Sequence, residues 1–147
     1  MNIDRYYTTH EQVKELLEYG IPKNTADCYR VLSKWSDTPA CPQVLDVTYE
    51  KMERRYQASF MRRAIPIEPC WSVGTLVDIY LKIVNHQSGM DHERFVFGEN
   101  IPPIHTIIQW VKCCVITDDI TKMLEDWAKS KENRTQYENQ YDDSMYY

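Results

Sequence analysis

The chain has 147 residues, of which 43% are hydrophobic, 12% aromatic and 27% charged. This length suits one domain with a single core, and the apolar and aromatic content excludes an intrinsically disordered chain. The net charge of −5 argues against binding nucleic acid through the whole surface, because neutralising phosphates takes clustered Lys and Arg with little opposing charge. A local basic face stays compatible with this composition.

No part of the sequence directs the chain into a membrane or out of the cell. No run approaches the roughly 18 apolar residues of a membrane span, and the first residues have neither the basic nor the apolar region of a signal peptide. The five cysteines are odd in number and show no paired spacing, which favours free thiols over disulfides or a zinc site. We therefore expect a cytoplasmic protein without membrane contact.

The first element is a helix over about 9–19. A capping box starts it, formed by one of two pairs: Thr9 with Gln12, or Thr8 with Glu11. Gly20 fits the left-handed position that closes a helix. Its expected buried stripe is Val13, Leu16 and Leu17.

The next stretch mixes turns, one strand and a second helix. We predict a turn at 24–27, a short strand at 28–32 and an irregular connection at 36–42. Helical spacing then predicts a helix over 47–62, carried by apolar residues at steps of four and three: Leu45, Tyr49, Met52, Tyr56 and Phe60. The prolines that follow make 65–69 extended.

The second half of the chain opens with the clearest amphipathic pattern. Ser72 caps a helix whose stripe runs through Val73, Leu76, Val77, Tyr80, Leu81 and Val84. A strand is expected at 93–97. For 104–116 we favour a buried strand because β-branched residues are dense there, with a helix as the alternative. A last helix covers about 118–131, and the acidic, Tyr-rich tail 132–147 is expected to be flexible.

The usual catalytic and ligand-binding constellations are incomplete. The four glycines are isolated, so no phosphate-binding loop is present. His86, Asp91, His92 and Glu93 lack the spacing of a zinc helix, so we predict neither a metal nor a cofactor. Apolar neighbours predict that Cys70, Cys113 and Cys114 are buried structural thiols. We therefore expect no enzymatic activity.

The middle helix carries the candidate binding residues. Helical phasing puts four cations on one arc, away from the apolar stripe: Lys51, Arg54, Arg55 and Arg62. Such an arc can hold phosphates, an acidic partner or the chain's own acidic tail. The alternative is a solvated helix face whose cations pair with Glu50 and Glu53.

Two segments carry a family resemblance: residues 7–21, YTTHEQVKELLEYGI, continuing to TADCY at 25–29, and residues 69–77, PCWSVGTLV. They resemble small proteins of phages and prophages of Bacteroides and related gut bacteria. The closing helix, with Met123, Leu124, Glu125 and Trp127, is similar to the final helix of that family. The resemblance covers about half of the chain. It implies a phage-associated protein of the bacterial cytoplasm and supplies no catalytic residues.

These observations predict a single α+β domain over 1–131, in which about four helices cover a small sheet, with a mostly helical domain as the alternative. The functional hypothesis is a non-enzymatic accessory protein that binds a host or phage macromolecule through the basic arc. The alternative hypothesis is an anti-defence protein that sequesters a nucleotide signal, a phosphate-bearing ligand. A homo-oligomer is left open.

Overall fold

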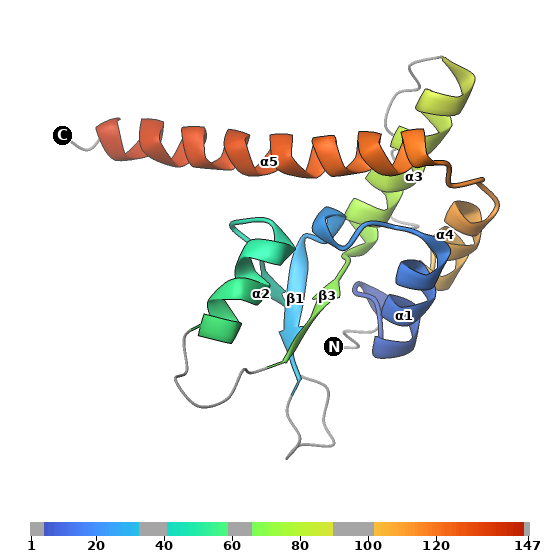
Figure 1. Ribbon diagram of the computed structural model, residues 1–147, viewed down its shortest axis with the longest axis horizontal. Coiled ribbons are helices and arrows are strands. Elements are labelled where there is room, and N and C mark those ends of the chain that lie inside the picture. Colours follow the sequence, from blue (N-terminus) through green and yellow to red (C-terminus); the bar gives the residue numbers. More distant parts are fainter. Residues whose placement is uncertain (1–4, 33–40, 59–65, 90–101, 146–147) are drawn as a thin grey trace.

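The protein is described by a computed structural model over residues 5–32, 41–58, 66–89 and 102–145, with side chains up to residue 131. Figure 1 shows the order of its elements: α1 His10–Tyr19, the 3-10 turn η2 Lys23–Thr25, β1 Cys28–Val31, β2 Gln43–Val44, α2 Tyr49–Ala58, β3 Ile67–Cys70, α3 Val73–Ser88, α4 Ile104–Lys112 and α5 Asp118–Met145. Over these residues the fold is one α+β domain with five α-helices and a three-stranded antiparallel sheet, which confirms the predicted class.

The sheet has the strand order β2-β1-β3, so β1 lies in the centre. Its register pairs Arg30 with Glu68 and Cys28 with Cys70. Because neighbouring residues of a strand point to opposite faces, these four side chains share one face. Figure 1 shows α1 and α2 on opposite sides of β1 and β3. On the α2 side, Tyr49 donates a hydrogen bond from its hydroxyl to the carbonyl of Ile67 over 2.9 Å.

The helix α1 starts and ends as predicted. Of the two expected capping boxes, the structure forms the one between Thr9 and Gln12. Gly20 closes the helix with a left-handed φ of 105°, a conformation that costs glycine little. Leu17 was expected in the buried stripe but is 38% exposed, because the face that meets the core is narrow and centred on Val13 and Leu16.

The helix α3 forms the centre of the core. Ser72 caps it, and the Ser72 backbone N–H and hydroxyl both donate to the Asp27 carboxylate, over 2.9 and 2.6 Å. Leu76, Ile79 and Ile83 are completely buried. Figure 1 shows α4 beside α3, and the apolar face of α4 belongs to the same core cluster.

The predicted strand at 104–116 is wrong: the structure has the helix Ile104–Lys112, followed by a turn. Its buried residues are spaced as one helix face: Ile104, Ile107, Ile108 and Val111. Packing of this face on the core outweighs the preference of β-branched residues for strands, which amounts to only about 1 kcal/mol per residue. The position directly after Pro103 also suits a helix start.

The helix α2 spans Tyr49–Ala58 and lies inside the predicted range 47–62. A residue of η2 stabilises its first turn, because the backbone N–H of Glu50 donates to the side-chain oxygen of Asn24 over 3.0 Å. The predicted strand at 93–97 lies outside the described residues, as do 36–40 of the predicted irregular connection.

The helix α5 starts at Asp118 as predicted but continues to Met145, well past the expected end at residue 131. Figure 1 shows its second half extending beyond the other elements toward the C-terminus. The flexible tail over 132–147 stays a prediction. Among the described helices, none combines the length and the apolar character that crossing a membrane requires.

Candidate functional site

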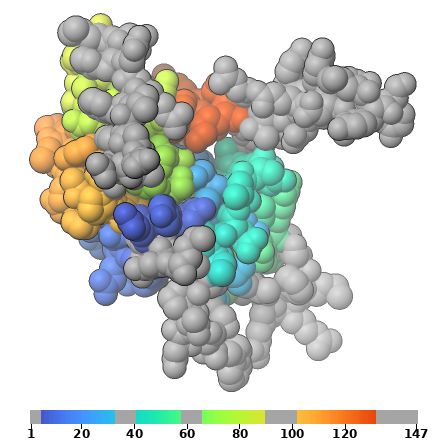
Figure 2. Space-filling model, turned by 180° about the vertical axis from the view of Figure 1, so that it is seen from behind, coloured from blue at the N-terminus to red at the C-terminus, as the bar shows by residue number. Residues whose placement is uncertain are grey.

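The predicted basic arc lies on the outer side of α2. Tyr49 and Met52 anchor the helix by their inner side, since their exposed fractions are 1% and 9%. The outward positions then belong to the cations Lys51, Arg54 and Arg55, all of which are exposed. We call these three residues the α2 basic face. Figure 2 shows residues 41–58, in teal, at the surface of the molecule. The fourth predicted cation, Arg62, lies outside the described residues.

The contacts of this face include an ion pair with a residue outside the helix. Arg55 pairs with Asp46 at 3.8 Å, with both side chains mostly exposed. Arg54 donates from Nε to the backbone carbonyl of Glu50 over 3.4 Å, and Lys23 donates to the Glu53 carboxylate over 3.3 Å. An exposed pair such as Arg55 with Asp46 contributes about 0–1 kcal/mol to stability. Lys51, Arg54 and Arg55 are all exposed, so a partner molecule can reach this side of the helix.

A second polar group, which we did not predict from the sequence, is buried on one face of the sheet. The Arg30 guanidinium donates to Glu68 Oε1 over 2.7 Å, and each side chain is 7% exposed. Arg30 also reaches the Cys70 sulfur at 3.2 Å, and His10 Nδ1 lies 2.5 Å from Glu68 Oε2. We call Thr8, His10, Arg30, Glu68 and Cys70 the sheet cluster.

The sheet cluster has the residue types of a cysteine catalytic site but not the geometry. Burial raises the Cys70 pKa above its ordinary value, against the opposing effects of Arg30 and Thr8. Burial likewise raises the pKa of Cys28, with Asp27 adding to the shift. A nucleophilic cysteine needs a thiolate and a base beside it. The histidine of the cluster contacts Glu68, and the raised pKa of Cys70 disfavours the thiolate. The contacts of Thr8 with Cys70 and of His10 with Glu68 join the N-terminal segment to β3.

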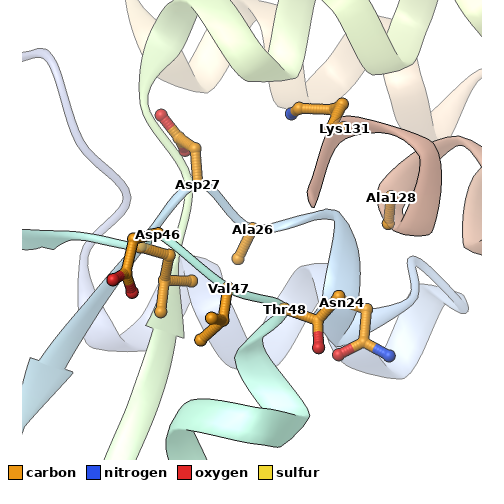
Figure 3. A pocket seen from close by; sticks show the side chains of 9 residues that line it. Asn24, Ala26, Asp27, Asp46, Val47, Thr48, Ala128 and Lys131 are labelled. Atoms are coloured by element: carbon orange, nitrogen blue, oxygen red, sulfur yellow. The ribbon is translucent and has the colours of Figure 1, made fainter. Parts of the chain in front are cut away.

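A small cavity lies between η2, the start of α2 and α5 (Figure 3). It measures about 80 Å³, and its polar lining is Asn24, Asp27, Asp46, Thr48 and Lys131. Burial lowers the Lys131 pKa, while Asp27 and Asp78 counteract this shift. Ligand sites for drug-sized molecules measure about 300–1,000 Å³. The cavity is too small for a nucleotide, and its lining does not include Lys51, Arg54 or Arg55.

A larger, open groove of about 700 Å³ runs between α3 and α5. From α3 it is lined by Lys82, Asn85, His86 and Gly89, and from α5 by Met123, Asp126, Trp127 and Ser130. We call it the α3–α5 groove. The Trp127 ring is half-buried, and the Lys131 ammonium lies 4.2 Å from its centroid. The lining combines the apolar side chains of Met123 and Trp127 with the charged side chains of Lys82 and Asp126.

The predicted burial of the three cysteines is confirmed for two of them. Cys70 and Cys114 are buried as expected, but Cys113 is exposed, because it follows the last turn of α4 on the side away from the core. In the described part of the chain, no three His, Cys, Asp or Glu side chains gather closely enough to hold a metal ion.

Comparison with protein-family models, with curated proteins and with solved structures gave no match.

Proposed function

We propose that this protein is a phage-associated accessory protein that catalyses no reaction and acts by binding an acidic protein of the host or the phage. The α2 basic face is the binding surface. The observation that supports it most directly is the outward exposure of Lys51, Arg54 and Arg55 on one side of a helix that its other side anchors in the core. The phage association rests on the resemblance of residues 7–29 and 69–77.

An acidic protein suits this surface better than nucleic acid does. The chain has 22 acidic against 17 basic residues, so a nucleic acid would meet repulsion around any local contact. Arginine recognises carboxylates through its planar, multiply donating guanidinium, and two of the three cations are arginines. The alternative of nucleotide sequestration has less support, because neither the small cavity nor the α3–α5 groove is lined by these cations.

The test is a pull-down from Bacteroides lysate followed by mass spectrometry, with three forms of the full chain. The first is the wild type, and the second is Lys51→Ser/Arg54→Ser/Arg55→Ser. The third, Lys14→Ser/Lys122→Ser/Lys129→Ser, is the matched control, since it removes the same charge from other exposed positions. We expect a protein partner that wild type and control retain and the basic-face variant loses.

The captured partner is then purified and its affinity measured. Three exposed charge pairs at about 0.2–1 kcal/mol each predict a Kd roughly three- to a hundredfold higher for the basic-face variant. Added salt should weaken wild-type binding, because exposed charges are screened. Equal capture by all three forms would refute the site. Capture that disappears after nuclease treatment would refute the proposed class of partner. Arg62→Ser alone tests whether the surface extends beyond α2.

A further inference from the structure

Two of the five cysteines lie directly opposite each other in the sheet. The register of β1 with β3 pairs Cys28 with Cys70, and the two strands lie side by side (Figure 1). Both cysteines are free, and their exposed fractions are 2% and 0%. Because residues directly opposite each other in a sheet point to the same face, the two thiols are neighbours inside the fold.

The backbone hydrogen bonds of the sheet set the spacing of this pair. Leu32 donates from its N–H to the carbonyl of Pro66 over 2.9 Å, so positions 32 and 66 form a hydrogen-bonded pair. Such pairs alternate along an antiparallel ladder, which makes Cys28 and Cys70 another one, with Cα atoms about 5.5 Å apart. Disulfides join cysteines whose Cα atoms are most often about 5.5–6 Å apart. The Cβ atoms of opposite residues are about 4.5–5.5 Å apart, so a shift of about 1 Å or less brings them within bonding range.

We propose that Cys28 and Cys70 are a reversible oxidation site, at which a small two-electron oxidant such as hydrogen peroxide joins the two sulfurs in a disulfide. The O–O bond of the peroxide breaks, one oxygen stays on the first sulfur as a sulfenic acid, and the other leaves as water. The second sulfur then attacks the oxidised sulfur, and the sulfenic oxygen leaves as another water. In sum, two thiols and one peroxide give one disulfide and two waters.

The charges around the two sulfurs make Cys70 the thiol that is oxidised first. The Arg30 guanidinium donates to the Cys70 sulfur over 3.2 Å, and this cation opposes the effect of burial, which raises the Cys70 pKa. Burial also raises the pKa of Cys28, and there the neighbouring Asp27 carboxylate adds to the shift. Because the thiolate is the form that reacts with peroxide, Cys70 forms the sulfenic acid and Cys28 resolves it.

The N-terminal segment covers Cys70 and controls the access of the oxidant. The Thr8 hydroxyl lies 3.6 Å from the Cys70 sulfur, and Thr8 is completely buried. Backbone hydrogen bonds hold this segment in place, from the Thr8 N–H to the Trp71 carbonyl over 3.0 Å and from the Val73 N–H to the Tyr6 carbonyl over 2.9 Å. Local opening of such a short segment needs less free energy than global unfolding. It admits a small oxidant to Cys70 while β1 and β3 stay paired.

The first test maps the bond in the folded chain. The variant Cys41→Ser/Cys113→Ser removes the two exposed thiols, which would otherwise react first, and keeps the buried Cys114 as an internal control. After hydrogen peroxide, we expect a mass about 2 Da lower and a peptide pair that links positions 28 and 70, with Cys114 still open to alkylation in denaturant. Cys28→Ala in the same background should give no linked peptides. Unlinked Cys28 and Cys70, or a bond to Cys114, would overturn the proposal.

The second test asks whether the fold itself brings the two sulfurs together. The Cys41→Ser/Cys113→Ser variant is equilibrated with mixtures of reduced and oxidised dithiothreitol, once in buffer and once in denaturant. If the sheet holds the sulfurs close to bonding distance, the equilibrium constant for the bond should be at least about tenfold larger in the folded chain. Excess reduced dithiothreitol should open the bond again. An equal or smaller constant in the folded chain would show that the register disfavours the bond and would overturn the proposal.

Discussion

Arginine appears in two opposite settings in this protein, in the sheet and on α2. Arg30 is 6% exposed and its guanidinium is held by Glu68 and Cys70. Arg54 and Arg55 are exposed, and the ion pair of Arg55 with Asp46 is at 3.8 Å. The comparison separates two uses of the same side chain: the buried arginine is fixed by an ion pair inside the fold, while the exposed arginines lie where another molecule can reach them.

The largest expected effect comes from breaking the buried pair. Arg30→Met leaves the Glu68 carboxylate buried without its main partner, which should lower the free energy of unfolding by about 3–5 kcal/mol. Chemical denaturation measures this loss. The double variant Arg30→Met/Glu68→Leu removes both charges and should recover most of the stability. A single variant that loses less than about 1 kcal/mol would show that the pair is not sealed from water.

A second, smaller effect is the response of the sheet to alkaline pH. The pKa values of Cys28 and Cys70 are raised above their ordinary value of 9.0, mainly by burial. A raised pKa gives stability that is complete below pH 9 and lost as the pH rises, because the unfolded chain releases the protons first. The free energy of unfolding should fall above pH 9 by up to about 1.4 kcal/mol per pH unit for each thiol.

Denaturation at several pH values checks this slope. The variant Cys28→Ala removes one titrating thiol, so its stability should fall less steeply above pH 9 than that of the wild type. The slope decides the test, since the small cavity left by the substitution lowers stability at every pH. Equal slopes would mean that Cys28 does not contribute to the alkaline loss.

The smallest effect is expected on α2. Arg54→Met changes an exposed residue, so the free energy of unfolding should stay within about 0.5 kcal/mol of the wild type. The same denaturation experiment as for Arg30→Met makes the comparison direct. A loss above about 1 kcal/mol would place Arg54 in the structural framework and weaken its assignment to the α2 basic face.

Local signals predicted much of this fold. The capping residues Thr9 and Ser72 marked the starts of α1 and α3, and the apolar spacing after residue 45 marked α2. The strand predicted at 104–116 was wrong because this run is rich in β-branched residues, which favour a strand, and also has its apolar residues at helical spacing. Only packing against α3 decides between them, and the sequence does not show that packing.

The sheet cluster was missed for a different reason. Arg30 and Glu68 are 38 positions apart, and only the register of β1 with β3 brings them together. A signal was nevertheless present, since polar or thiol residues alternate at 28 and 30 in one extended segment and at 68 and 70 in the other. Two such segments in one small domain indicate a sheet face with a polar interior. The α2 basic face was accessible to sequence reasoning because it depends on helical phasing alone.

The N-terminal helix also bears on how the chain matures during synthesis. The Tyr19 hydroxyl lies within hydrogen-bond distance of the backbone carbonyls of Lys112 and Cys114, and Asn24 contacts Glu125, 101 positions later. During synthesis, most of the polypeptide must therefore leave the ribosome before α1 and η2 can form these contacts. Contacts this distant in sequence slow folding. The nascent chain keeps apolar surface exposed until these contacts form. Until α4 and α5 emerge, the apolar surface that they cover in the folded protein is open to aggregation.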